Sequence, residues 1–152
     1  PSQQVLRLEG DELARDMEGA HFLFCNDYEF GLISKKTGWS LDQILEHVNI
    51  LVITRGKDGA DLYMDGESVH IPTVPEDEIV DPTGVGDSFR GGFLAGYSQG
   101  FDWKLCGEIG SLAAVYCLEQ RGPQSHSYTH EEFVARFRRH FDDGGKLDVF
   151  LK

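Results

Sequence analysis

The stretch Asp81–Phe89, DPTGVGDSF, combines residues that can bind an anion with a carboxylate that can act as a base. Gly84 and Gly86 permit backbone angles that other residues avoid, and they carry no side-chain bulk. We expect the amides of Gly84, Val85 and Gly86 to converge at the start of a following helix, where unpaired N–H groups favour an anion. Asp87 would lie at the edge of this site, placed to accept a proton from a hydroxyl that attacks a bound phosphoryl group.

A structural explanation of the same aspartate is simpler, because Asp is common at the start of helices. Two other phosphate-binding motifs do not match. A Walker A loop ends in Gly-Lys-Ser/Thr, whereas this turn ends in Gly-Asp-Ser, and the dinucleotide fingerprint needs a third glycine where Phe89 stands. The short glycine–x–glycine–aspartate pattern therefore leaves both a catalytic and a structural Asp87 open.

The first half of the chain predicts strands that alternate with helices. Residues 21–25 and 50–54 are continuously apolar, as buried strands are, and the second run is typical of a parallel strand that is covered on both faces. Helices are expected over residues 11–18, over 27–37 after a cap at Asn26-Asp27 and before Gly38, and over 39–47 with Ser40 as N-cap. Residues 60–64 and 68–71 should pair as a hairpin across Asp65-Gly66.

The second half predicts mainly helices. After an acidic connection over residues 73–80, helical spacing of apolar residues runs over about 87–99, 105–119 and 130–141, the last with Thr129 as N-cap. The tail, residues 142–152, is expected to be weakly structured apart from a docking segment at 149–151. Alternating strands and helices predict an α/β fold, and no domain boundary is evident, so we expect residues 1–152 to form one domain.

Composition narrows the class of protein. The 152 residues carry a formal net charge of −12, which disfavours nucleic acid as a partner but not a nucleotide held by local donors. No apolar run approaches the roughly 18 residues of a membrane span, and we expect no signal peptide at the start of the chain. The three cysteines form no CxxC pair, so we expect reduced, buried thiols and a cytoplasmic protein.

The longer string DPTGVGDSFRGGFLAGY resembles the C-terminal signature of the ribokinase-like, or PfkB, family of sugar and nucleoside kinases. The resemblance implies a Rossmann-type layered fold with helices on both faces of a mainly parallel sheet. It also implies that the Gly84–Gly86 amides form an anion hole and that Asp87 is the catalytic base. In many members of the family the first aspartate and the threonine of the motif, here Asp81 and Thr83, lie by a monovalent-cation site, which makes K⁺ a candidate cofactor.

The segment CNDYEF resembles the family's N-x-x-E motif and assigns Asn26 and Glu29. By this resemblance the two residues position Mg²⁺ and the phosphates of ATP, largely through water. Mg²⁺ prefers oxygen ligands and keeps several of its waters, which fits such a role. The same spacing is also a common capping box, in which Asn26 caps a helix and Glu29 is its partner, and both interpretations can hold together.

The segment ITRGKDGADLY resembles the family's T-x-G-x-x-G nucleotide-binding stretch and assigns Thr54, Gly56 and Gly59. Thr54 ends a predicted strand, and ligands of open α/β sheets bind at the carboxyl ends of strands. A plain strand-to-hairpin turn explains the two glycines equally well. Arg55 and Lys57 are expected to be exposed cations of this turn, with the capacity to steer ATP phosphate.

The resemblance runs over about residues 1–141 but covers only the C-terminal, nucleotide-binding half of the family's fold. The resemblance implies that the chain lacks the family's N-terminal half, with its lid and most acceptor-binding residues. The chain opens on PSQQ without a methionine, so we expect a processed, truncated or partial product.

Two functions follow from these patterns. The first is an ATP-dependent kinase for a primary hydroxyl of a nucleoside or sugar, with a form closest to bacterial adenosine kinase or carbohydrate kinase members and with fructose- or ribose-type sugars as alternative acceptors. The second is a catalytically inert ATP-binding fragment that lacks the acceptor site and associates, for example as a homodimer, through an exposed sheet edge.

Overall fold

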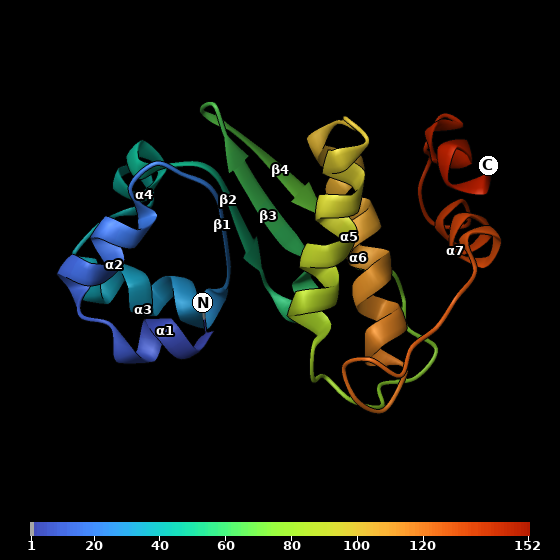
Figure 1. Ribbon diagram of the computed structural model, residues 1–152, viewed down its shortest axis with the longest axis horizontal. Helices are drawn as coiled ribbons and strands as arrows, with labels where there is room; N and C mark the ends of the chain where they lie inside the picture. Colours follow the sequence, from blue (N-terminus) through green and yellow to red (C-terminus); the bar gives the residue numbers. More distant parts are fainter. Residues whose placement is uncertain (1) are drawn as a thin grey trace. The chain divides into compact units, whose positions relative to one another are not determined.

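The computed structural model describes residues 2–152. It divides into two compact units, Pro1–His70 and Ile71–Lys152, which are described separately (Figure 1). Within the described residues no helix is long and apolar enough to cross a membrane. The expectation of a single domain stays a prediction.

The first unit is an α/β unit. Its helices are α1 (Ser2–Arg7), α2 (Gly10–Met17), α3 (Asp27–Thr37) and α4 (Leu41–His47), and its strands are β1 (Ala20–Asn26), β2 (Val48–Thr54), β3 (Ala60–Met64) and β4 (Glu67–Ile71), whose last residue opens the second unit. A short 3₁₀ turn, η1 (Gly56–Asp58), joins β2 to β3. The strand order is β1-β2-β3-β4. Because β1 and β2 are parallel and β2 and β3 antiparallel, the sheet is mixed, and the α/β prediction is confirmed.

Local signals account for most boundaries in this unit. Asn26 and Ser40 each close a capping box at the start of their helix, and Gly38 ends α3 in the left-handed conformation, with φ 74°. The hairpin turn has φ 49° at Asp65 and 78° at Gly66, as a two-residue type I′ turn requires.

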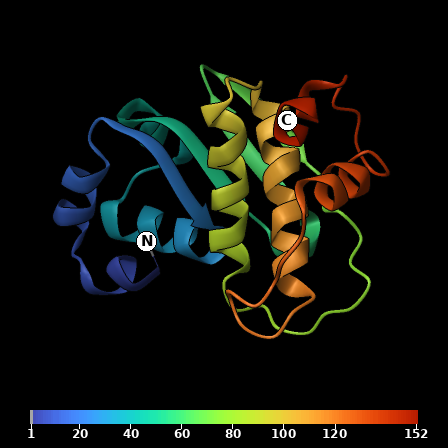
Figure 2. The same ribbon diagram turned by 45° about the vertical axis from the view of Figure 1, so that its right-hand side comes forward.

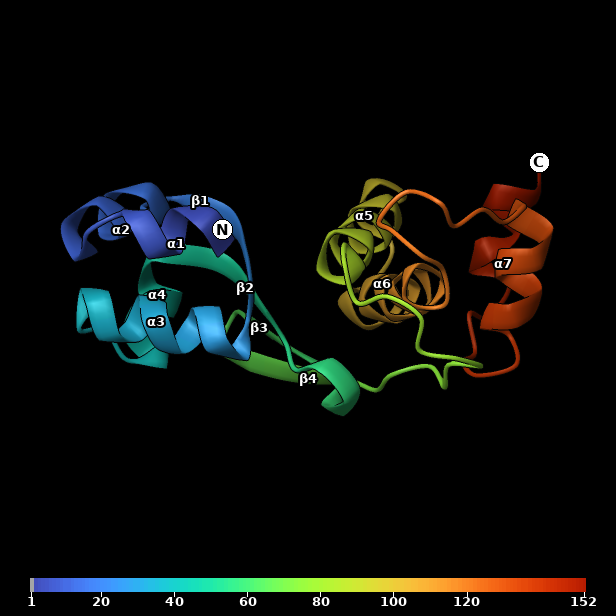
Figure 3. The ribbon, with the colours of Figure 1, turned by 90° about the horizontal axis from the view of Figure 1, so that it is seen from below.

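The helices of the first unit gather beside β1 and β2, as Figure 3 shows from below. A buried cluster joins them to the sheet through Leu13, Met17, Cys25, Ile33, Ile44, Leu51 and Ile53. Leu51 and Ile53 alternate along β2 and so share one face of the strand. Burying this face fixes where the carboxyl ends of β1 and β2 lie.

The second unit is helical. Its elements are α5 (Val85–Ser98), α6 (Trp103–Leu118), α7 (His130–Phe137) and the 3₁₀ helix η2 (Lys146–Leu151). Figure 2 shows α5 and α6 side by side. Their close approach needs glycine: a Cβ at Gly92 would lie 2.8 Å from the Cβ of Ala113 and 2.9 Å from the Ile109 carbonyl oxygen. The glycines of α5, poor helix formers, are thus explained by packing.

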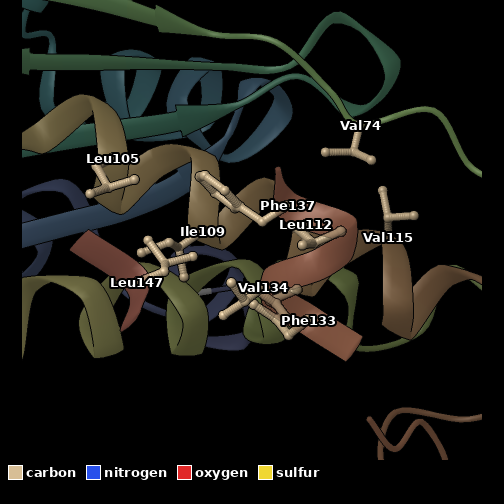
Figure 4. Close-up of a cluster of buried hydrophobic side chains, with 10 residues drawn as sticks. Val74, Leu105, Ile109, Leu112, Val115, Phe133, Val134, Phe137 and Leu147 are labelled. Carbon is tan, nitrogen blue, oxygen red and sulfur yellow. The ribbon is translucent and has the colours of Figure 1, made fainter. Parts of the chain in front are cut away.

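A second apolar cluster joins α6, α7 and η2, with Leu112, Phe137 and Leu147 fully buried (Figure 4). Two expectations for this region are wrong. Helix α7 ends at Phe137 rather than near residue 141, and the tail carries the helix η2. Directly after α7, the Arg138 guanidinium donates to Asp143 and Asp148 and so connects the end of this helix to the tail. Of residues 149–151 only Phe150 packs against the cluster, and Val149 and Leu151 are exposed.

Candidate functional site

The turn before α5 has the geometry expected of an anion-binding helix start. Gly84 is the N-cap, with φ 83° and ψ −1°. The first helical hydrogen bond runs from the Ser88 N–H to the Gly84 carbonyl oxygen at 2.9 Å. The N–H groups of the first residues of a helix have no carbonyl within it to bind, so those of Gly86 and Asp87 point past its end. The Val85 N–H has a long contact of 3.4 Å with the Pro82 carbonyl oxygen, so this amide is partly engaged.

Asp87 is the third residue of α5, and its side chain is 81% exposed. Its Oδ1 lies 3.3 Å from Nη1 of Arg90, one turn further along the helix. An exposed pair of this kind contributes little to stability. The carboxylate is therefore free to move toward a ligand at the helix start, in a position where it is not needed as an N-cap, because Gly84 holds that position.

Packing behind the turn leaves no room for a side chain at Gly84. A Cβ there would lie 2.4 Å from the Cβ of Pro123 and 3.6 Å from Sγ of Cys117. The Cys117 thiol in turn donates to the carbonyl oxygen of Thr83 at 3.4 Å. The end of α6 and the loop after it thus form the back wall of the turn.

Asp81 joins this wall to the turn. Its Oδ1 accepts from the Thr83 N–H at 2.9 Å and its Oδ2 accepts from the Gly122 N–H at 3.0 Å. These bonds from Thr83 and Gly122 lower the pKa of Asp81 below its ordinary value. Gly122, Pro123 and Cys117 were not assigned from the sequence. Contacts between such distant residues cannot be read from motif spacing.

In the first unit Asn26 and Glu29 form a reciprocal pair at the start of α3. The Asn26 Oδ1 accepts from the Glu29 N–H at 2.8 Å, and the Glu29 Oε2 accepts from the Asn26 N–H at 3.0 Å. Glu29 is only 8% exposed. The capping-box interpretation is confirmed. Each side chain keeps a second polar atom, Nδ2 and Oε1, beyond these bonds, so a water-mediated role is compatible with the cap.

Thr54 lies beside Asn26, because the two residues pair across the parallel strands at their carboxyl ends. Gly56 has φ 57° and Gly59 has φ 85°, so both positions of the following turn favour glycine. The turn is closed by a hydrogen bond of 2.7 Å from the Arg55 N–H to the Gly59 carbonyl oxygen. Asn26, Glu29 and Thr54 thus meet at one edge of the sheet, and Gly56 and Gly59 shape the loop that leaves it.

The Arg55 side chain is engaged in a polar cluster that the sequence did not predict. Its Nε donates to Asp61 Oδ2 at 2.6 Å, and Nδ1 of His70 lies 2.7 Å from Asp61 Oδ1. Partial burial alone would raise the pKa of Asp61, but the hydrogen bonds from His70 and Arg55 outweigh it and hold that pKa below the ordinary value. Asp61 pairs with Ile53, one step inside the strand end, so Arg55 folds back over the sheet. This geometry does not favour Arg55 as a phosphate ligand.

The predicted site residues therefore fall into two sets, one at the carboxyl edge of β1 and β2 and one at the start of α5, in separate units. Among residues 2–152, no group of three or more His, Cys, Asp or Glu side chains is arranged to hold a metal ion.

A helix start with amides that have no helical partner is a common anion-binding element of α/β proteins. The family model described as "pfkB family carbohydrate kinase" matches residues 5–130. The chain belongs to the pfkB family of carbohydrate kinases.

Individual relatives agree with this assignment. A nucleoside kinase of Methanocaldococcus jannaschii is 34% identical over 140 residues, covering 92% of this chain and 46% of the relative. The structure of Burkholderia thailandensis nucleoside kinase in complex with inosine is 41% identical, with a TM-score of 0.90, covering 93% of this chain and 47% of that chain. The chain therefore spans about half the length of these relatives. The ribokinase-like fold is confirmed.

A more distant structure, the adenosine kinase of Sinorhizobium meliloti, shares the fold with a TM-score of 0.72 at 23% identity. The family resemblance seen in the sequence is confirmed by the family model that matches residues 5–130. The narrower likeness to bacterial adenosine kinase is not, since the relatives with higher identity described above are named nucleoside kinases.

Proposed function

We propose that this chain is the ATP-binding and catalytic part of a kinase that transfers the γ-phosphoryl group of ATP to a primary hydroxyl of a nucleoside. The observation that carries the proposal is the turn Gly84–Asp87: a glycine N-cap, helix amides without helical partners and an exposed carboxylate, in a chain of the pfkB family. Adenosine and inosine are the first acceptors to test, because the Burkholderia thailandensis relative was solved with inosine and with ADP-inosine. Fructose- and ribose-type sugars are the alternative class of acceptor.

In the proposed mechanism Asp87 accepts the proton of the attacking hydroxyl. The amides of Gly84, Val85 and Gly86 stabilise negative charge on the transferred group, with the Gly86 N–H better placed than that of Val85, which contacts Pro82. Thr54, Gly56 and Gly59 contribute to nucleotide binding. Phosphoryl transfer depends mainly on positioning and electrostatic stabilisation, so a weak base suffices.

Asn26 and Glu29 are the proposed holders of Mg²⁺, through water, and Mg²⁺ would supply neutralisation of phosphate charge. Asp81 and Thr83 are the residues to which the family resemblance assigns a monovalent cation such as K⁺.

The second candidate function is an inert nucleotide platform that associates through a sheet edge. It is favoured by the coverage of the relatives, of which this chain spans about half, and by β1 and β4 standing at the two ends of the sheet order. An end strand offers backbone groups for pairing with another chain.

The test is phosphorylation of a panel of purine and pyrimidine nucleosides and of sugars, together with calorimetric titration of Mg·ATP into the same sample. Turnover with one acceptor class identifies the substrate class and supports the kinase. ATP binding without turnover on any acceptor favours the inert platform, and sedimentation then shows whether the chain self-associates. Absence of ATP binding contradicts both functions.

A further inference from the structure

The turn before α5, which carries the proposed anion-binding amides, is held in place by hydrogen bonds to the end of α6 and to the loop after it. The N–H groups of Val80 and Asp81 both donate to the Leu118 carbonyl oxygen, at 3.0 and 3.1 Å. This carbonyl belongs to the last residue of α6. The backbone that enters the turn is therefore fixed to the end of α6 before the first glycine is reached.

The Asp81 side chain provides the second attachment. One carboxylate oxygen binds the Thr83 N–H inside the turn at 2.9 Å, and the other binds the Gly122 N–H of the loop after α6 at 3.0 Å. A single side chain thus connects the turn to the wall formed by Cys117 and Pro123, against which Gly84 packs. Both oxygens are used as acceptors of backbone N–H groups.

We propose that Asp81 is a positioning residue that sets the direction of the Gly86 and Asp87 amides by clamping the turn to the loop after α6. This inference rests on the proposed phosphate-binding role of the α5 start, and it differs from a role of Asp81 as a ligand of a monovalent cation. A cation ligand acts only when the cation is present, whereas a clamp acts in any salt.

The variant Asp81→Asn removes one of the two hydrogen bonds by which the side chain connects the turn to the loop after α6. The Asn oxygen can still accept from Thr83, but its NH₂ group cannot accept from the Gly122 N–H, so two donors face each other. Asp142→Asn is the matched control, because Asp142 Oδ1 also accepts from the N–H two residues ahead, that of Gly144, at 2.9 Å, but lies outside the turn.

The first readout is the ¹H–¹⁵N spectrum of the ligand-free protein. The clamp predicts that Asp81→Asn shifts the amide signals of residues 83–87 and Gly122, and leaves those of α7 in place. Unchanged signals at 83–87 would overturn the inference, whether or not the chain binds nucleotide.

The second readout is calorimetric titration of ADP in potassium buffer and in tetramethylammonium buffer. Loss of a hydrogen bond to a charged group should weaken ADP binding by about tenfold or more in Asp81→Asn and leave Asp142→Asn unchanged. An equal loss in both buffers supports the clamp, and a loss confined to potassium overturns it in favour of a cation ligand. A wild-type chain that binds no ADP contradicts the proposed function, and the amide signals then decide the inference alone.

Discussion

Gly84→Ala tests how strongly the turn before α5 depends on having no side chain at its N-cap. The residue has φ 83°, in the left-handed region, and a Cβ there would lie 2.4 Å from the Pro123 Cβ and 3.0 Å from its Cα. Two costs therefore add. A non-glycine residue in the left-handed region costs about 1–2 kcal/mol. Forcing an extra carbon into a packed site costs about 1–3 kcal/mol more.

The expected loss of unfolding free energy is therefore about 2–5 kcal/mol, a large part of the roughly 5–15 kcal/mol of an ordinary domain. Urea unfolding followed by tryptophan fluorescence measures it, since Trp103 lies in the same unit. Because Pro123 is rigid backbone and ring, the site cannot relax by a rotamer change.

Two further glycines separate the two costs. Gly100 has φ 73°, and a Cβ added there would have no atom within 4 Å. Gly100→Ala should therefore lose only the free energy of placing a side chain in the left-handed backbone region, about 1–2 kcal/mol. Gly86 lies inside α5, also with nothing within 4 Å, so Gly86→Ala should be neutral or stabilise by up to about 1 kcal/mol. If Gly84→Ala costs no more than Gly100→Ala, the packing argument is refuted.

Three other predictions concern contacts elsewhere in the chain. Asn26→Ala removes the cap that binds the Glu29 N–H and should cost about 0.5–2 kcal/mol by urea unfolding; an unchanged midpoint would mean that the cap is not formed in solution. Arg138 lowers the pKa of Asp143 from 3.8 to about 2, so this pair's stabilisation is present above about pH 4 and is lost as the pH falls through about 2. Asp143→Asn should therefore destabilise at pH 7, on the order of 2 kcal/mol, and much less near pH 2, and a pH-independent difference would contradict the assignment. Burial raises the pKa of the Cys25 and Cys106 thiols to about 12, so an aromatic disulfide reagent at pH 8 should label them only after unfolding, and rapid labelling of both in the native protein would contradict their burial.

Local signals made much of the fold predictable. Some residues act only through neighbours one to four positions away along the chain, and the structure places a cap, a helix end or a turn at each of them. These residues are Asn26 with Glu29, Ser40, Gly38 and Asp65-Gly66. The fold of the tail differs from the expectation: after α7, Arg138 reaches Asp148, ten residues further along the chain. Hydropathy spacing contains no information on such a contact.

The candidate site shows the same limit. The glycines and Asp87 were identified from one continuous motif, and the helix start that they predict is present. The engagement of Arg55 with Asp61, and of Asp81 with Gly122 some forty residues away, depends on how distant segments pack. Motif spacing can name the residues of a site, but the partners that orient them become visible only in the folded chain.

The most direct test of the central claim is the rate of phosphoryl transfer from Mg·ATP to the best acceptor of the panel, compared between the wild-type chain and Asp87→Asn. The two side chains are nearly the same size, but the amide cannot accept the hydroxyl proton. The account predicts at least about a hundredfold loss of turnover in Asp87→Asn with Mg·ATP affinity retained. A variant that turns over at the wild-type rate would contradict Asp87 as the base, and with it the proposed chemistry of the turn.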